Sequence, residues 1–441
     1  MTSPARREEL LDALRRGTVP RQSLDLLAVG LDGFEATVGE ELERTGKGNG
    51  GFKAVRGEYG SGKTFFVRWL QERARRQGFV TAEVQISENE TPLYKLHTVY
   101  RRLMERLSTR EQSTGAFRSL VDLWFYTLEQ DVLVGGTVAE DDDPAIRRAV
   151  EELMSRRLSE IAEKAPMFAQ AMRGYLDLHE RGEDRDAEAV LAWLSGQPNV
   201  AAGPKRAAGV KGEIDHDGAL TFLKGLLKVL RDSGHSGLVL VLDEVETLQR
   251  MRSDVRDKSL NALRQFMDEL SEGLFPGLYL VLTGTPAFFE GPQGVRRLEP
   301  LAQRLHTDFA GLAEFDNPRA PQIRLPGFDQ AKLEQLGRRV RDVYADGSSA
   351  EERVREMVDD AFIADFARSL VGELGGKVGL APRIFLRKLV SSVLDKVELH
   401  ATFDPREHGG IQIDPSELTR EEAAAAGNLS VEDVQLDLNE D

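Results

Sequence analysis

The sequence predicts an α/β protein: a five-stranded parallel sheet flanked by helices, with a helical insertion and an all-helical C-terminal lid. Three observations lead to this prediction. Short apolar segments alternate with amphipathic helical segments, which is typical of a parallel sheet covered on both faces. A charged, helix-rich block interrupts this alternation in the middle of the chain. From about residue 329 onward, helical segments follow one another with no strand between them.

The first part of the predicted core covers residues 21–107 and follows an N-terminal helix within residues 1–20. That helix is amphipathic and ends at Gly17. The expected core elements, in the order strand, helix, strand, helix, are residues 52–56, 65–76, 79–86 and 92–107. A glycine-rich loop joins the first strand to the first helix.

The predicted insertion, residues 108–217, contains helices over 146–163 and 167–180 and a loop over 196–212. The second part of the core then occupies residues 218–327. Its expected elements, in the order helix, strand, helix, strand, strand, are residues 220–230, 238–243, 258–270, 278–282 and 322–325.

The predicted lid covers residues 328–400 and the acidic tail covers residues 401–441. Three helices are expected in the lid, over residues 332–344, 350–374 and 382–398. The tail is rich in carboxylates and poor in bulky apolar residues, so we expect it to pack weakly.

Composition limits the possible functions. The 441 residues include no cysteine, which excludes disulfides and thiolate metal sites and suits a reducing cytoplasm. No segment approaches 18 unbroken apolar residues, the length that a membrane-spanning helix needs, so no membrane partner is expected. The net charge of −16 argues against a protein dedicated to coating nucleic acid.

The glycine-rich loop predicts a phosphate-binding site. Its residues are Gly57, Glu58, Tyr59, Gly60, Ser61, Gly62, Lys63 and Thr64. Glycines at these spacings let backbone N–H groups face phosphate oxygens, while Lys63 adds a positive charge and Thr64 offers a hydroxyl to Mg²⁺. The cofactors implied are ATP and Mg²⁺.

The second chemical signal is a buried strand that ends in two carboxylates, Asp243 and Glu244. The carboxyl ends of parallel strands line the ligand crevice, so Asp243 is expected to hold Mg²⁺ through water. Glu244 is placed to accept a proton from the water that attacks the γ-phosphate. Glu246 is interpreted as a surface residue.

This order of parts resembles that of the AAA+ ATPases, in particular the branch with origin-recognition and Cdc6-like initiators. The resemblance implies that Thr283 orients the attacking water, with Thr285 as the alternate. It also implies that Arg304 reaches the nucleotide of a neighbouring subunit in a homo-oligomer, and that Arg383 contacts the phosphates of its own subunit. Arg296, Arg297 and Arg319 compete for the role of Arg304.

A narrower resemblance is to the ATP-binding proteins of bacterial BREX-type phage-defence loci. The segments that carry it are Val29-Gly30, the loop at 57–64, Leu282-Thr283-Gly284-Thr285-Pro286 and Gly379-Leu380-Ala381-Pro382-Arg383. This resemblance implies an antiviral role beside other proteins of the locus, with a helicase as one candidate, and an action at DNA.

Two features of the sequence leave alternatives open. Val29 either lines an adenine pocket or simply packs in the core. The basic residues Lys205, Arg206 and Lys211 either follow a DNA backbone or form a solvated surface. Two functions fit these observations: an ATPase that drives conformational change in an assembly, or a nucleotide-gated binding module with slow hydrolysis.

Overall fold

The computed structural model describes residues 3–136, 138–139, 141–309, 311–373, 381–408 and 414. Most of the predicted acidic tail, together with Gly379 and Leu380 of the segment at 379–383, lies outside these residues.

A five-stranded sheet forms the centre of the described part of the chain. Its strands are β1 (Gly51–Arg56), β2 (Val80–Gln85), β3 (Leu238–Asp243), β4 (Leu278–Gly284) and β5 (Gln322–Arg324). Their order across the sheet is β2-β3-β4-β1-β5, and every neighbouring pair is parallel. The predicted fold class is therefore confirmed.

The register of the strands places their carboxyl ends side by side. The last residues of β2 and β3, Gln85 and Asp243, are paired, and near the ends of β1 and β4, Val55 is paired with Thr283. Loops that leave different strands therefore meet along one edge of the sheet, although they lie far apart in the sequence.

Helices cover both faces of the sheet, as the uninterrupted apolar strands require. In β3, the side chains of Leu238, Leu240 and Leu242 belong to one hydrophobic cluster, whereas Val239 and Val241 belong to another. The first cluster includes residues of α4 (Leu96–Arg106), α11 (His216–Asp232) and α12 (Ser253–Ser271). The second includes residues of α2 (Asp32–Gly46) and α3 (Lys63–Arg76). Two short helices, α13 (Pro286–Glu290) and α14 (Glu299–Arg304), follow β4.

A buried lysine interrupts the apolar pattern of β1. Lys53 in β1 is almost fully buried, and its ammonium lies 2.7 Å from a carboxylate oxygen of Glu41. The Tyr279 hydroxyl donates a hydrogen bond to the other oxygen of this carboxylate. Burial lowers the pKa of Lys53, while Glu41 opposes that shift. A buried charge is tolerated here because it is paired.

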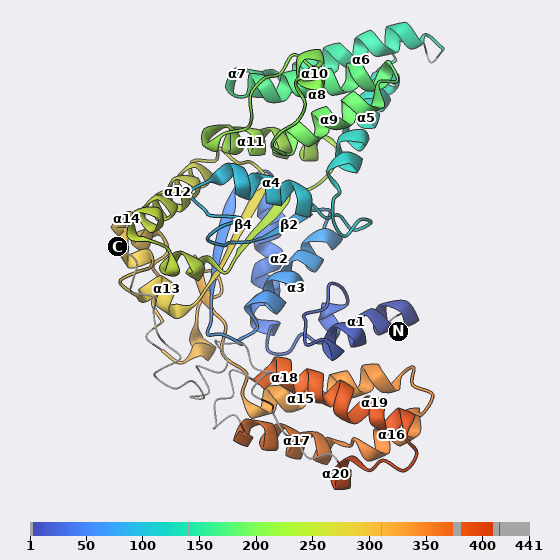
Figure 1. Cartoon of the computed structure of the whole chain (residues 1–441), viewed down its shortest axis with the longest axis vertical. Coiled ribbons are helices and arrows are strands. Elements are labelled where there is room, and N and C mark those ends of the chain that lie inside the picture. The colour runs from blue at the N-terminus through green and yellow to red at the C-terminus, as the bar shows by residue number, and fades with distance from the viewer. Residues whose placement is uncertain are drawn as a thin grey trace.

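The insertion is helical and lies at the opposite end of the molecule from the lid (Figure 1). Its helices are α5 (Phe117–Val134), α6 (Asp143–Arg157), α7 (Ser159–Lys164), α8 (Pro166–Glu180), α9 (Asp184–Leu194) and α10 (Ala202–Ala207). The prediction of a loop over residues 196–212 was wrong in part, because α10 forms within it. Gly174 of α8 allows Ala208, which directly follows α10, to pack closely against α8. A Cβ atom at residue 174 would lie 2.4 Å from the Cβ of Ala208.

The lid consists of helices from the C-terminal part of the described chain, and the N-terminal helix packs on them. Its helices are α15 (Gln330–Ala345), α16 (Glu351–Met357), α17 (Asp360–Glu373), α18 (Ala381–Lys388), α19 (Asp395–Leu399) and α20 (Pro405–His408). The π-helical turn Leu389–Leu394 joins α18 to α19. The helix predicted over 350–374 is instead divided into α16 and α17.

The N-terminal helix α1 (Pro4–Arg15) packs on this lid (Figure 1). Leu10, Leu11 and Leu14 are buried in the same hydrophobic cluster as side chains of α15 and α18. The guanidinium of Arg15 lies 2.9 Å from a carboxylate oxygen of Asp395. Within the described residues, no helix is both long and apolar enough to cross a membrane.

The contact between α1 and the lid yields a stability prediction. Leu14 is 2% exposed, so Leu14→Ala leaves a cavity and should lower the unfolding free energy of the lid by about 3 kcal/mol. Hydrogen exchange measured at increasing urea concentrations should show reduced protection of the backbone amides in α15 and α18. Leu399→Ala is the matched control, because Leu399 is 73% exposed and its loss should cost about 0.5 kcal/mol or less. Equal effects of the two substitutions would contradict the packing described.

Candidate functional site

The glycine-rich loop connects β1 to α3 in a conformation that requires its glycines. Gly60 and Gly62 have φ values of 77° and 93°, a region that side chains rarely adopt. At Gly57 a Cβ atom would lie 2.2 Å from the Ser61 hydroxyl. That hydroxyl is buried and has no hydrogen-bond partner in the described structure. A curled loop with an unused polar group at the start of a helix fits a phosphate ligand.

Lys63 lies at the centre of the site. The residue is 8% exposed, and its ammonium donates hydrogen bonds to the carbonyl oxygens of Gly57 at 2.8 Å and Glu58 at 3.2 Å. Burial lowers the pKa of Lys63, and the carboxylates of Glu246 and Asp243 oppose that shift. In this structure the ammonium is therefore held against its own loop.

Asp243 and Thr64 face each other across the site. The Thr64 hydroxyl lies 3.5 Å from Oδ2 of Asp243, and the Thr283 hydroxyl donates a hydrogen bond to Oδ1. Burial raises the pKa of Asp243, while the bond from Thr283 lowers it. A hydroxyl opposite a carboxylate is a donor set that suits Mg²⁺, and the residues present therefore fit this ion.

Glu244 occupies a strained turn immediately after β3. Its φ of 59° is uncommon for a residue with a side chain, and such strain is typical of functional sites. Its carboxylate accepts a hydrogen bond of 2.7 Å from the amide of Gln85 at the end of β2. Its backbone N–H donates to the Thr283 hydroxyl at 3.0 Å. The two neighbouring strands therefore fix both the backbone and the side chain of Glu244.

The structure distinguishes the two threonines considered for the water-orienting position. Thr283 contacts both Asp243 and Glu244. Thr285 instead caps α13, where its hydroxyl accepts a hydrogen bond of 3.4 Å from the N–H of Phe288. The arrangement therefore favours Thr283 over Thr285 as the polar group beside the acidic pair.

Two residues of the site were not found from the sequence. The interpretation of Glu246 as a surface residue was wrong: it is 6% exposed, and one carboxylate oxygen lies 4.0 Å from the Lys63 ammonium. The side chain points inward because the chain turns into a 3-10 helix, Val245–Arg250, directly after Glu244. Gln85 was also missed, although its position at the end of a predicted strand could have indicated it.

The remaining candidate residues lie around this centre. Val29 is buried in the hydrophobic cluster of the lid, together with Leu333 and Leu336. Arg383 is the third residue of α18, and its guanidinium lies near Gly17. Arg304 lies at the end of α14, where it forms an ion pair of 2.5 Å with Asp268.

The three arginines that compete with Arg304 differ in their surroundings. Arg297 pairs with Asp257, and Arg319 pairs with Glu40 at 3.0 Å. Arg296 is exposed on the segment between α13 and α14. Each of these side chains therefore lies on the surface, and the described contacts do not assign the role to any one of them.

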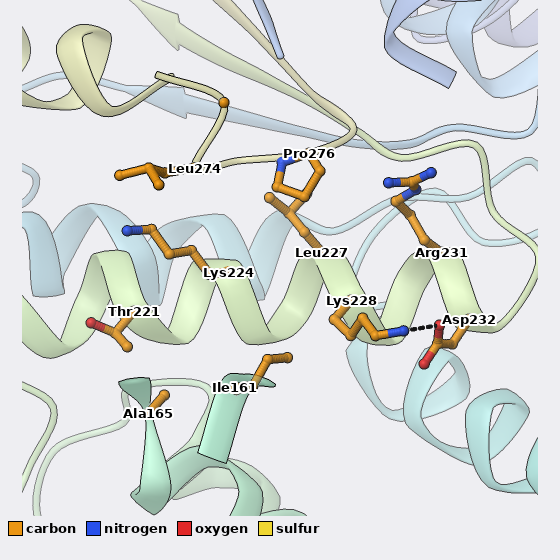
Figure 2. Close-up of a pocket in the computed structure, with 11 residues that line it drawn as sticks. Ile161, Ala165, Thr221, Lys224, Leu227, Lys228, Arg231, Asp232, Leu274 and Pro276 are labelled. Atoms are coloured by element: carbon orange, nitrogen blue, oxygen red, sulfur yellow. Dashed lines mark hydrogen bonds and ion pairs between the residues drawn. The ribbon is translucent and has the colours of Figure 1, made fainter. Parts of the chain in front are cut away.

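A cavity of about 510 Å³ lies at the end of the sheet opposite the phosphate loop (Figure 2). Lys224, Lys228 and Arg231 of α11 line it, opposite Leu274 and Pro276, which precede β4. Lys224 pairs with Glu269 at 2.8 Å and Lys228 with Asp232 at 2.6 Å. These acids largely neutralise its lysines, and the cavity lies at the amino ends of the strands, away from the phosphate loop.

This chain is similar to a known protein family and to solved structures. One of the solved structures that match is "Structure of Drosophila ORC bound to DNA", with 13% identity and a TM-score of 0.41. The alignment covers 97% of this chain and 73% of the ORC chain. No curated protein sequence matches. The family model "BREX system ATP-binding protein BrxC/D" matches residues 2–412.

That match includes the glycine-rich loop, the acidic end of β3, the insertion and the described lid helices. The resemblance to BREX ATP-binding proteins that the sequence motifs indicated is thereby confirmed. The chain belongs to the BrxC/D family of BREX system ATP-binding proteins.

Proposed function

We propose that this protein hydrolyses ATP in the presence of Mg²⁺ and couples turnover to conformational change in a phage-defence assembly that acts at DNA. The observation that carries the proposal is the meeting of Lys63, Thr64, Asp243 and Glu244 at one edge of the sheet. Hydrolysis needs a charge for the phosphates, ligands for a metal and a base for water, and these residue types supply all three.

Each side chain has a separate task in this proposal. Lys63 turns from its loop carbonyls toward the phosphates, and Thr64 and Asp243 would hold the metal ion. A bound Mg²⁺ would offset the negative charge of the phosphate oxygens. Glu244 accepts the proton of the attacking water. The Thr283 hydroxyl positions Glu244 by accepting a hydrogen bond from its backbone N–H.

A second candidate function is a nucleotide-gated module that recruits a partner and hydrolyses ATP slowly. The hydrogen bond between Gln85 and Glu244 favours it, because a carboxylate held by an amide is less available as a base. The two functions differ in what releases Glu244: nucleotide and a neighbouring subunit in the first, and a separate partner in the second.

The proposal of an assembly rests on two candidate arginines, Arg304 and Arg383, and on the family to which the chain belongs. Arg304 would reach the nucleotide of a neighbouring copy, for which it must leave Asp268, and Arg383 would act within its own subunit. Other proteins of the defence locus, with a helicase as one candidate, are the proposed partners. Lys205 and Arg206 of α10, with Lys211, are the proposed DNA contacts; Arg206 and Lys211 are exposed.

Replacement of the loop lysine tests ATP binding. Lys63→Ala removes the one loop cation that can contact the phosphates, so the Kd for ATP should rise about 100-fold or more. Isothermal titration calorimetry at fixed Mg²⁺ would measure it. Lys258→Ala is the matched control, since Lys258 is exposed on α12 and should leave the Kd unchanged.

Replacement of the base separates binding from chemistry. Glu244→Gln keeps the size of the side chain but cannot accept the proton, so turnover should fall about 100-fold or more while the Kd for ATP stays within about twofold. Phosphate release under single-turnover conditions would measure the chemical step. Hydrolysis at the parental rate would show that another group is the base.

Protein concentration distinguishes the two candidate functions. If neighbouring copies complete the site, ATP hydrolysed per chain should increase severalfold with protein concentration, and Arg304→Ala should abolish the increase. Arg296→Ala and Arg319→Ala provide the comparison. A rate that stays flat and close to that of Glu244→Gln, with or without duplex DNA, would favour the nucleotide-gated module.

A further inference from the structure

The carboxylate of Glu246 is the unexplained group in this site. Both of its oxygens are buried, and neither has a hydrogen-bond partner in the described structure. Buried carboxylates are normally hydrogen-bonded, because removing their charge from water is costly. Burial raises the pKa of Glu246 to about 7. A side chain kept in such a position calls for a role that offsets this cost.

The neighbouring charges indicate what that role is. The Lys63 ammonium lies 4.0 Å from Glu246 and favours its charged form. Asp243 and Glu244 are close enough to disfavour it. Glu246 is therefore a third carboxylate beside the cation that the phosphates need.

The position of Lys63 places Glu246 in competition with a nucleotide. The ammonium is held by two loop carbonyl oxygens on one side and attracted by Glu246 on the other. When the ammonium turns toward phosphates, Glu246 loses its counter-charge and remains buried beside further negative charge. The repulsion grows with each added phosphate charge, because the surroundings are dry.

We propose that Glu246 is a positioning residue that holds Lys63 in the nucleotide-free site and weakens the binding of ATP more than that of ADP. This inference rests on the ATP site of the proposed function. The Glu246 carboxylate then limits the affinity of the site for nucleotide. Bound nucleotide is therefore released faster than the phosphate loop alone would allow.

The test compares nucleotide affinity with stability. Glu246→Gln keeps the size of the side chain and removes the charge. The Kd for ATP should fall about tenfold and the Kd for ADP about threefold. The Tm of the nucleotide-free protein should change little, because the cost of burying the carboxylate is removed while the Lys63 ammonium keeps its hydrogen bonds to the carbonyl oxygens of Gly57 and Glu58. Glu246→Met removes the same charge and should give the same order of affinities.

Two controls separate this effect from net charge and from packing. Glu272→Gln removes one exposed carboxylate at the end of α12 and should leave both Kd values unchanged. Glu246→Asp keeps a charge at the same place and should stay within about threefold of the parental Kd for ATP. Equal tightening by Glu272→Gln and Glu246→Gln would overturn the proposal, since net charge would then explain the result.

Other outcomes are also decisive. Weaker ATP binding by Glu246→Gln, with or without a lower Tm, would show that the carboxylate supports the bound or folded state and does not compete with the nucleotide. Equal changes for ATP and ADP would overturn the charge argument. If the parental protein fails to bind ATP, the nucleotide site itself is wrong, which distinguishes that failure from the failure of the present inference.

Discussion

The parallel register of β1, β2, β3 and β4 is the constraint on which the site depends. Parallel strands have their carboxyl ends at one edge, so the phosphate loop after β1, the acidic pair at the end of β3 and Thr283 of β4 come together there. Gln85 joins them because it is paired with Asp243. A shift of one residue in any of these strands would turn the polar side chains away from the site.

At that edge, most of the described polar groups form hydrogen bonds with one another. Lys63 bonds to its loop, Asp243 accepts from Thr283, and Glu244 accepts from Gln85. In the function proposed above, Lys63 exchanges its contacts for the phosphates and Glu244 exchanges its contact for the attacking water. The buried oxygens of Glu246 and the hydroxyl of Ser61 are the exceptions among the described side chains of the site. The site is thus a hydrogen-bonded network beside one carboxylate, Glu246, whose only described partner is the Lys63 ammonium at 4.0 Å.

The lid and the insertion give this core different surroundings at its two ends (Figure 1). The lid lies on the side of the phosphate loop: Phe65 of α3 packs against its cluster, and Phe328 lies 3.7 Å from the position of a Cβ at Gly62. The N-terminal helix α1 is part of the same cluster, so it packs with the lid. The insertion instead extends the hydrophobic cluster of the opposite face through α5, α8 and α9. The fold therefore places the phosphate loop beside the lid and the insertion at the opposite end of the molecule.

The sequence by itself determined the fold class and the family, and it indicated the phosphate loop and the acidic pair, because these depend on local patterns. Helix periodicity, apolar strands and glycine spacing can each be recognised within a short stretch of sequence, without knowledge of the tertiary contacts. The pairing of Gln85 with Glu244, the burial of Glu246 beside Lys63, the buried charge of Lys53 and the docking of α1 on the lid were decided by the tertiary structure. These features join residues separated by up to several hundred positions, and a polar residue has the same local pattern whether it faces water or a partner. Only the folded chain, in which the partner and the exclusion of water are both fixed, distinguishes the two.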